Sequence, residues 1–285
     1  MVRMSEVKRV CLRFLLLLIV VGTFARDQGV TASDAVAERQ WNTGLQGGKI
    51  EDSSPTLADI DQDGYSEVII GTTLHGAGPT LVVMEHTGEI KWEVSLTDPM
   101  NSSPAVADLD FPPDGQPEII VSTGGDVDQI CGSIIAFDRF GQQVWRYDTI
   151  DAQNSGTPSG NFASPTIGDV DQDGDLEIVI GSWDRNIYML DHMGNYVWHY
   201  HVADSVWSTA ALADLNEDGN LEVIIGTDIM GGGILPDGYR PTDGGFVLIL
   251  DKDGCKLARR QMNEAIYSSP AVGDVDRDGD LEIFV

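Results

Sequence analysis

The stretch DIDQDGYSE, residues 59–67, places four carboxylates within nine residues and runs directly into the apolar segment VIIGT. Asp59, Asp61 and Asp63 alternate along the chain, Gly64 allows a tight turn, and Glu67 stands at the ninth position. Alternating oxygen ligands around a glycine turn are typical of a loop that wraps one hard cation, and calcium is the first candidate. The stretch therefore predicts a calcium-binding loop that leads into a buried strand.

Five segments of the chain align with this stretch and determine the expected architecture. They begin SSPTLADIDQDG, SSPAVADLDFPPDG, ASPTIGDVDQDG, STAALADLNEDG and SSPAVGDVDRDG, at residues 53, 102, 163, 208 and 268. Their first aspartates are 49, 61, 45 and 60 residues apart. These periods are too long for hairpin repeats and agree with propeller blades of about four strands each.

Each repeat also contains the signals for four strands. The acidic loop is followed by a β-branched run such as EIVIGS, then by NIYMLDHMG, and then by YVWHYHV. Asp-x-x-Gly between the last two runs, as at Asp191 and Gly194, is a turn signal. Helical periodicity is absent after the leader. We therefore predict an all-β chain in which each unit reads strand A, acidic loop, strand B, strand C, tight turn, strand D.

Residues 53–285 resemble the FG-GAP (VCBS-type) repeat family, whose members include the repeats of the integrin α-chain N-terminal β-propeller. The resemblance rests on in-phase copies of Asp-x-Asp-x-Asp-Gly-x-x-Glu, each followed by a β-branched strand. It implies a β-propeller ring of about seven blades, whereas this sequence shows four blades and the start of a fifth. We therefore expect a fragment of a larger ring. DRFGQQVW and DHMGNYVW also look like blades of quinoprotein-type propellers, which supports the same fold.

Residues 1–25 have the pattern of a secretory signal peptide. Four basic residues precede an unbroken apolar run at residues 14–21, and Thr23-Phe24-Ala25 resembles a cleavage site. The run is shorter than the about 20 residues of a membrane span, so a retained N-terminal anchor is the less favoured alternative. Residues 26–52 form an N-terminal segment in which Trp41 resembles a strand-D tryptophan. This segment is a candidate for the strand that closes the ring.

The composition limits the partners of the chain. Without the leader, 13 basic and 45 acidic residues remain, a net charge near −32. Such an acidic excess argues against nucleic acid and anionic membrane surfaces as partners, while the recurring apolar strands argue against disorder. Cys131 and Cys255 are too few and too distant for a disulfide framework, and we expect both to be unpaired. The leader predicts a secreted or cell-surface protein, with the periplasm as an alternative.

The acidic loops supply a set of predicted calcium ligands in every repeat. Loop four replaces one aspartate by Asn216, a neutral oxygen donor, and loop two is two residues longer and contains Pro112 and Pro113, so its spacing is not kept. In the resembled family the backbone carbonyl of the seventh position is a further ligand. The predicted ligands are Asp59, Asp61, Asp63, Tyr65 and Glu67; Asp108, Asp110, Asp114 and Glu118; Asp169, Asp171, Asp173, Asp175 and Glu177; Asp214, Asn216, Asp218 and Glu222; and Asp274, Asp276, Asp278, Asp280 and Glu282.

An EF-hand and a metal-free acidic turn are the alternatives to a propeller calcium loop. An EF-hand places its last carboxylate at position twelve between two helices, whereas here it stands at position nine before a β-branched strand. Solvated acidic turns without metal remain an alternative for any single loop, and five copies argue against it. Clustered carboxylates repel one another, so we expect calcium to be structural and not catalytic.

The candidate ligand surface lies on the other face of the predicted propeller. The A–B loops and C–D turns share one face, and the B–C and D–A connections, which include the long segments 148–161 and 228–245, share the other. Loops on a rigid scaffold carry binding functions. Trp92, Trp145 and Trp198 repeat at one strand-D position and are expected core residues. Just before the Ser-Ser-Pro-like start of each strand A stand Asp52, Asn101, Phe162, Trp207 and Tyr267, which are candidates for sugar or peptide contact, the alternative being packing between blades.

These observations predict an exported, calcium-binding β-propeller that acts as a non-enzymatic binding or adhesion module for an extracellular protein or a polysaccharide. The alternative is an enzyme on the same scaffold, such as a polysaccharide lyase or a quinoprotein-like oxidoreductase. The sequence contains no Gly-x-Ser-x-Gly, His-Glu-x-x-His or phosphate-binding glycine motif, and no catalytic residue is singled out. A membrane is an expected partner only through a retained anchor.

Overall fold

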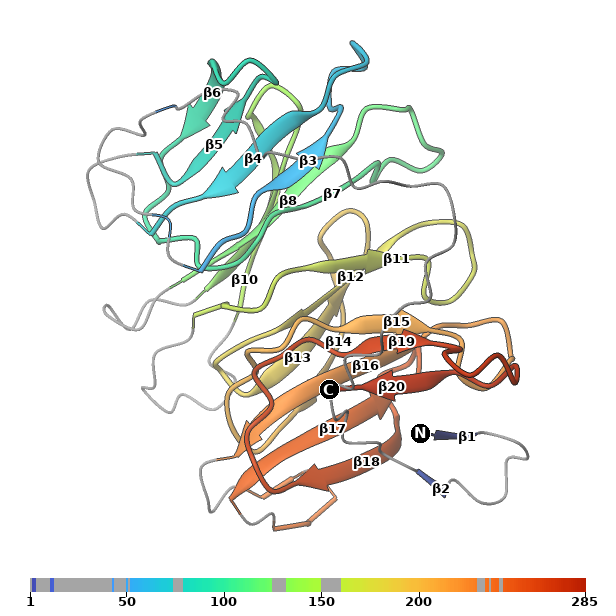
Figure 1. Ribbon diagram of the computed structural model, residues 1–285. Helices are drawn as coiled ribbons and strands as arrows, with labels where there is room; N and C mark the ends of the chain where they lie inside the picture. Colours follow the sequence, from blue (N-terminus) through green and yellow to red (C-terminus); the bar gives the residue numbers. More distant parts are fainter. Residues whose placement is uncertain are drawn as a thin grey trace, which may run out of the picture.

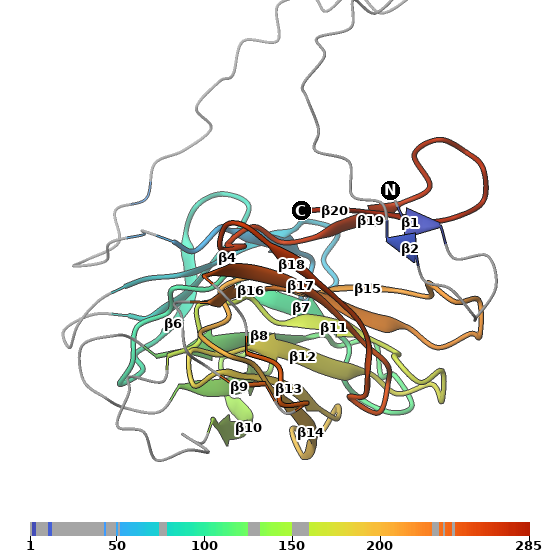
Figure 2. The ribbon, with the colours of Figure 1, turned by 90° about the horizontal axis from the view of Figure 1, so that it is seen from below.

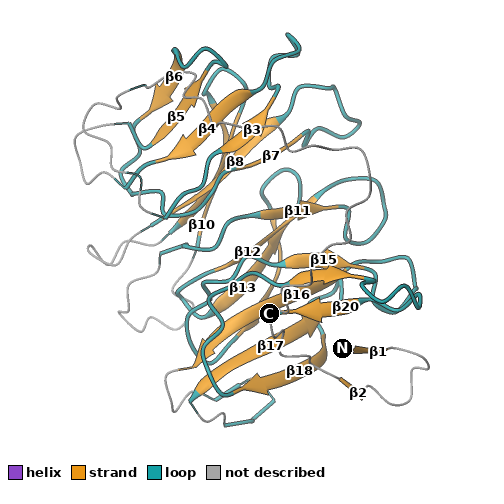
Figure 3. Cartoon of the chain, viewed as in Figure 1, coloured by secondary structure: helices purple, strands orange, loops and turns teal. Residues whose placement is uncertain are grey.

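The computed structural model describes residues 2–3, 11–12, 43, 50, 52–73, 79–124, 132–149, 160–229, 234–235, 237–240 and 243–285. These residues form strands, turns and loops, and none of them lies in an α-helix (Figure 3). In the part of the chain that the structure describes there is accordingly no helix of the length and apolarity that a membrane crossing requires. The prediction of an all-β chain is confirmed.

Four antiparallel sheets of four strands follow one another along the chain, each with its strands in sequence order (Figure 1). Blade one contains β3 (Thr56–Ala58), β4 (Glu67–Gly71), β5 (Leu81–Met84) and β6 (Ile90–Val94). Blade two contains β7 (Ala105–Ala107), β8 (Glu118–Thr123), β9 (Ser133–Phe137) and β10 (Gln143–Asp148). Blade three contains β11 (Thr166–Gly168), β12 (Glu177–Gly181), β13 (Asn186–Leu190) and β14 (Tyr196–His201).

Blade four and the beginning of a fifth sheet complete the described strands. Blade four contains β15 (Ala211–Ala213), β16 (Glu222–Ile229), β17 (Gly244–Leu250) and β18 (Lys256–Met262). The fifth sheet contains β19 (Ala271–Gly273) and β20 (Glu282–Phe284), which correspond to strands A and B. The predicted strand order, with the acidic loop between strands A and B, is therefore present in blades one to four, and the fifth sheet has strands A and B.

The blades are arranged around their first strands. Strands β3, β7, β11, β15 and β19 are in contact with one another in succession. Each of them is three residues long and consists mainly of alanine, glycine, threonine or valine, and such small side chains allow neighbouring blades to approach closely. In Figure 2 blade two runs from β7 outward to β10, and blade three runs from β11 outward to β14.

The hydrophobic core lies between the faces of adjacent blades. Strands β9, β12 and β13 are buried at every residue, because both faces of the sheet pack against neighbouring blades. One cluster joins Ile69 and Val83 of blade one to Val121 and Ile135 of blade two. A strand covered on both faces reads as a continuous apolar run. The continuous apolar runs in the sequence therefore predict the positions of strands B and C correctly.

The repeated tryptophans bridge neighbouring blades, as predicted for core residues. Each indole Nε1 donates to a backbone carbonyl in the C–D turn of the next blade: Trp92 to Arg139 at 2.8 Å, Trp145 to His192 at 3.1 Å and Trp198 to Lys252 at 2.8 Å. Gly194 illustrates why the turn ends in glycine. Its φ is +76°, and a Cβ there would lie 2.5 Å from the Trp145 ring.

The N-terminal predictions fall mostly outside the described residues. Within the predicted signal peptide, β1 (Val2–Arg3) and β2 (Cys11–Leu12) pair as an antiparallel ladder, and the remainder of residues 1–25 is not described. Trp41 also lies outside the described residues, although the Thr43 hydroxyl donates to the Gly88 carbonyl in the C–D turn of blade one. Cleavage of the leader and closure by this segment stay predictions.

Candidate metal sites and ligand face

The five acidic loops share one hydrogen bond that joins the start of each loop to the start of strand B. The last glutamate of each loop, at position nine or in loop two at position eleven, is buried in every copy. Its Oε2 accepts the backbone N–H of the residue that follows the first aspartate, over 2.7 to 3.0 Å. The contact holds the carboxylate under the loop and leaves Oε1 for another partner. The five glutamates are Glu67, Glu118, Glu177, Glu222 and Glu282.

Two further contacts repeat in the loops and fix the aspartates. The first aspartate of each loop accepts the N–H of the loop glycine, for example Asp59 Oδ2 from Gly64 at 2.9 Å and Asp214 Oδ2 from Gly219 at 3.0 Å. The third aspartate accepts the N–H two residues later, as Asp63 does from Tyr65 at 2.8 Å. Equivalent pairs occur in the other loops. The loop backbone is therefore folded around its own carboxylates.

In four of the loops the carboxylate oxygens gather within 4.8 Å of one another. The extra residues of loop two do not prevent this, because Asp108, Asp110 and Glu118 meet as their counterparts do. In loop four the Asn216 side-chain amide donates to Glu222 Oε1 at 2.8 Å. The groups are Asp59, Asp61 and Glu67; Asp108, Asp110 and Glu118; Asp169, Asp171 and Glu177; Asp173, Asp175 and Glu177; and Asp274, Asp276 and Glu282.

The oxygen atoms of these loops fit a hard divalent cation. Asp169 Oδ1 and Glu282 Oε1 are buried without a hydrogen-bond partner. Glu282 as a whole is only 1% exposed. A buried carboxylate oxygen without a donor is costly, and a cation satisfies it. The predicted donors are carboxylate, amide and backbone oxygens, without thiolate or imidazole. Such a set of oxygen ligands favours calcium, whereas zinc is mostly bound by cysteine and histidine. The residues present are thus suited to calcium.

Three of the buried loop glutamates, Glu118, Glu177 and Glu222, are difficult to ionise in the protein alone. Burial raises the pKa of Glu118 to about 7, of Glu177 to about 8 and of Glu222 to about 7. Neighbouring aspartate charges raise these pKa values further, whereas the backbone N–H bond opposes the rise. A divalent cation would offset both the burial and the repulsion.

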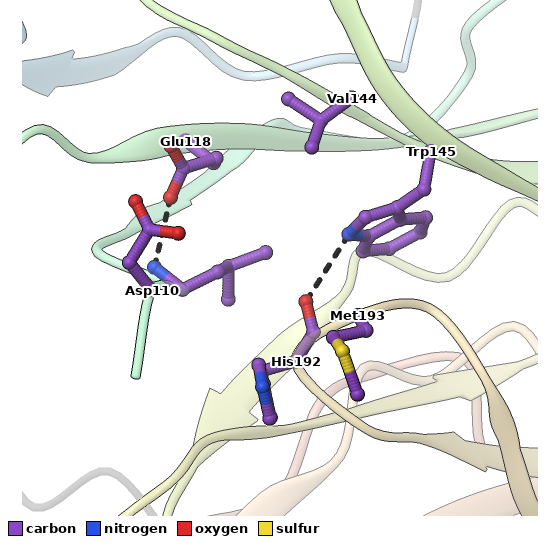
Figure 4. A pocket seen from close by; sticks show the side chains of 7 residues that line it. Asp110, Glu118, Val144, Trp145, His192 and Met193 are labelled. Carbon is purple, nitrogen blue, oxygen red and sulfur yellow. Dashed lines mark hydrogen bonds between the residues drawn. The ribbon is translucent and has the colours of Figure 1, made fainter. Parts of the chain in front are cut away.

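A pocket of about 410 Å³ lies on the acidic-loop face between blades two and three. In Figure 4 Asp110 and Glu118 form one side, with His192 and Met193 on the other. The His192 Nδ1 lies 3.0 Å from Asp175 Oδ2, and the His192 ring lies 6.4 Å from the ring of Phe111 in loop two. The insertion in loop two therefore contacts blade three beside its acidic loop.

Aromatic side chains form a cluster on the opposite face, where the D–A and B–C connections meet. Phe162 stacks on Trp183 with ring centroids 4.2 Å apart, and Trp183 lies 4.6 Å from Trp207. Trp207 in turn contacts Tyr267 edge-on at 5.6 Å. Blade three and the connections into blades four and five thus contribute to one surface. We call Phe162, Trp183, Trp207 and Tyr267 the aromatic cluster.

Three of the five predicted ligand-face residues belong to the aromatic cluster. The other two, Asp52 and Asn101, have no aromatic ring and are not part of the cluster, which is defined by its ring contacts. Trp183, in the B–C turn between β12 and β13, was not predicted, because the predicted ligand residues were those that precede strand A in each repeat. The signal that could have found it is the topology, since B–C turns and D–A connections share a face.

Polar contacts hold the aromatic cluster in place while leaving part of it exposed. The Trp183 backbone N–H donates to the Gly160 carbonyl at 3.0 Å, and Trp207 Nε1 donates to Ser205 Oγ at 3.1 Å. Tyr267 is 59% exposed, and its hydroxyl donates to Asp228 at 3.3 Å. Phe162, Trp183 and Trp207 are half-buried. The rings thus pack between blades and also present a surface.

Of the long B–C segment of blade four, Asp228 reaches this surface through the Tyr267 hydroxyl, whereas residues 237–240 lie elsewhere. Residues 237–240 lie along β18, where Asp237 pairs with Lys256 and with Arg259 at 3.0 Å. The Arg259 guanidinium lies over the Tyr239 ring at 4.1 Å. These residues therefore contact side chains of the outer strand of the blade.

This architecture is similar to a known repeat family and to solved structures. Residues 169–225, from loop three to strand B of blade four, match the family model of the FG-GAP-like repeat. The chain contains an FG-GAP-like repeat on a β-propeller fold. A comparison with curated proteins gave no match. The predicted resemblance to FG-GAP propellers is therefore confirmed.

Solved β-propellers resemble this chain at low sequence identity. The Bacillus licheniformis rhamnogalacturonan lyase PL11 has 18% identity and a TM-score of 0.52, over 80% of this chain and 43% of the lyase. Rhamnogalacturonan lyase YesW has 19% identity and a TM-score of 0.53, over 81% and 43%. The C-terminal domain of Pseudomonas aeruginosa PilY1 has 16% identity and a TM-score of 0.51, over 76% and 51%. The chain covers about half or less of these proteins, and the likeness shows the fold alone.

A buried aspartate supports the turn that presents Trp183. Asp184 is 3% exposed and accepts the Asn186 N–H at 3.0 Å and the Tyr188 hydroxyl. Its backbone N–H bonds to Ser182 Oγ at 3.3 Å. Burial raises the pKa of Asp184 to about 6, against the lowering effect of these hydrogen bonds. Ionisation of Asp184 therefore costs more free energy in the folded protein than in the unfolded chain.

Replacement of Asp184 by asparagine is expected to change the pH dependence of stability. Because the folded pKa of Asp184 lies above its usual 3.8, this residue lowers stability as pH rises from about 4 to 6, by roughly 3 kcal/mol in all. Asp184→Asn cannot ionise, so the variant should gain on the wild type across this range. Urea unfolding at pH 4 and pH 7 in excess calcium measures the difference, with exposed Asp253→Asn as control. An equal offset between Asp184→Asn and the wild type at both pH values contradicts the expectation.

Proposed function

We propose that this FG-GAP propeller is an exported, calcium-stabilised module that binds an extracellular protein or a polysaccharide through the aromatic cluster. The observation that carries the proposal is the aromatic cluster itself, in which four rings from successive blades form one partly exposed surface. Such surfaces with polar groups at their edge are typical of ligand sites. Ser205 and Asp228 supply polar contacts at this edge.

Calcium has a structural role in the proposed function. The carboxylates of each acidic loop come from the end of strand A, the loop and the start of strand B. A bound cation would neutralise them and hold the two strands together, which stabilises the blade without taking part in chemistry. Extracellular calcium concentrations suit sites of modest affinity. The predicted leader and the calcium loops therefore support the same compartment.

The charge of the chain narrows the kind of partner. A net charge of −29 over 285 residues opposes close approach of polyanions. An uncharged polysaccharide, or a protein surface that is neutral or basic, fits this balance. Aromatic rings provide stacking area for sugar rings and for apolar side chains alike.

The enzymatic alternative has no specific observation in its favour. Two of the similar structures are rhamnogalacturonan lyases, but at 18% and 19% identity the likeness concerns the fold. Propellers host both binding modules and enzymes. Cleavage of rhamnogalacturonan by the purified chain, in an assay for unsaturated products, would contradict the non-enzymatic proposal.

Truncation of the aromatic cluster is expected to abolish most of the binding. Trp207→Ala and Trp183→Ala should each weaken affinity by about tenfold or more, because central aromatic residues dominate such contacts. Affinity electrophoresis through gels containing one neutral polysaccharide each, with a parallel panel of extracellular proteins, supplies the readout. Phe140→Ala is the control, since Phe140 is 62% exposed in a C–D turn on the other face. Equal binding by the wild type and Trp207→Ala would remove the cluster from the proposed site.

A further inference from the structure

The acidic loop of blade one differs from the others because an ammonium group lies among its carboxylates. The Lys91 side chain is 18% exposed, and its Nζ donates to Asp61. It also lies 3.3 Å from Glu67 Oε1 and 2.9 Å from Glu85 Oε1. Asp61 and Glu67 are members of the loop-one group. One cation of the protein thus pairs with two predicted calcium ligands.

The position of Lys91 is occupied by apolar residues in the other blades. Each strand D contains an extra residue that is skipped in the pairing with strand C, immediately before the tryptophan position. In blade one this bulge residue is Lys91. Its counterparts are Val144, Val197 and Leu257, which are 55%, 46% and 46% exposed. In blade one the side chain at the bulge reaches the carboxylates of the acidic loop. Of the four blades, only blade one has a charged residue at this position.

A second departure from the repeat occurs beside Lys91. The C–D turns of blades two, three and four begin with an aspartate whose Oδ1 accepts two N–H groups of its own turn, as Asp138 does at 2.9 and 2.8 Å. Blade one has Glu85 at this position, and its longer side chain reaches Lys91. Two substitutions in the same blade therefore meet at the same loop.

The free oxygen of the ninth-position glutamate shows what the ammonium replaces. In loop five Glu282 Oε1 is buried without a hydrogen-bond partner, and in loop four Asn216 donates a neutral amide to Glu222 Oε1. In loop one Glu67 is fully buried, and its Oε1 faces Lys91. The loop-one carboxylates thus have a positive partner from the protein itself.

We propose that Lys91 is an internal cation that holds the loop of blade one without metal, so that calcium enters this loop only by displacing the ammonium. The inference rests on the proposed calcium role of the other loops. It makes the five loops unequal: loop one has the weakest calcium affinity and stays ordered when calcium is removed. Blade one would then keep its A–B connection under conditions that loosen the other blades.

The test compares Lys91→Val, which introduces the residue of blades two and three, with Lys256→Val. The control removes the same charge from strand D of blade four, where Asp237 keeps its pair with Arg259. Equilibrium dialysis with radioactive calcium measures ions bound to the full chain, and calorimetry measures melting in EDTA. Lys91→Val is expected to bind one more calcium ion than the wild type at limiting calcium, or to tighten its weakest site about tenfold, and to melt at a lower temperature in EDTA. Lys256→Val should match the wild type in calcium binding.

Two further variants keep the inference open to refutation if Lys91→Val folds poorly. Lys91→Gln removes the charge but keeps much of the side-chain length, and Lys91→Arg keeps the charge. The glutamine variant should bind calcium as Lys91→Val does, and the arginine variant as the wild type does. Unchanged calcium binding and unchanged EDTA melting in the uncharged variants overturn the inference. A wild type that binds no calcium refutes the calcium role in the proposed function, whereas EDTA melting still decides whether Lys91 stabilises loop one.

Discussion

Removal of calcium with EDTA is expected to lower the melting temperature of this chain by roughly 10 °C or more. Each site that is occupied at about 100 times its dissociation constant contributes roughly 2.7 kcal/mol to stability. In a chain of this size about 1 kcal/mol corresponds to a shift of roughly 2–4 °C. Four acidic loops without an internal lysine would therefore produce a large combined effect. Scanning calorimetry with and without EDTA measures it.

Single-loop variants show whether the effect comes from the acidic loops. Glu177→Gln removes a buried ligand charge of loop three, and this variant should lose part of the calcium-dependent increase in melting temperature. Asp253→Asn removes an exposed acidic group, 69% exposed in its side chain and outside the loops, and should keep the full increase. Excess calcium should restore the EDTA-treated wild type. A melting temperature that does not respond to EDTA would refute a structural role for calcium.

Trp198→Ala is expected to destabilise the chain by about 3–5 kcal/mol. The Trp198 ring is 8% exposed and belongs to the core cluster between blades three and four. Its Nε1 donates to the Lys252 carbonyl, and the ring packs on Gly254. Removal of the ring opens a cavity and leaves that carbonyl without its donor. Urea unfolding in excess calcium measures the loss.

Two other tryptophan variants serve as controls for this loss. Trp198→Phe keeps most of the ring volume and should cost clearly less than Trp198→Ala. Trp207→Ala removes a half-buried ring of the aromatic cluster, so its effect on stability should also be smaller. Equal stability losses for Trp198→Ala and Trp207→Ala would contradict the distinction between the core tryptophans and the ligand face.

The sequence was sufficient for the parts of the protein that depend on local spacing. The hydrogen bonds of an acidic loop join residues two to nine positions apart, as with Asp59, Gly64 and Glu67. A spacing of this kind fixes the geometry almost by itself, and its repetition revealed the blades. Loop two shows the limit of the rule, because Asp108, Asp110 and Glu118 meet despite the altered spacing. The antiparallel pairing of β7 with β8 holds the ends of that loop together.

Contacts between distant residues were decided only by the tertiary structure. Lys91 reaches Asp61 across 30 residues because a bulge in β6 directs it toward the loop, and no spacing rule contains that bulge. Trp183 joins Trp207 because the B–C turn of one blade lies beside the connection into the next. The sequence by itself determined the repeat, the strands and the acidic loops, since these depend on neighbours along the chain. The tertiary structure decided which side chains meet between strands and blades, because register, bulges and blade packing set those distances.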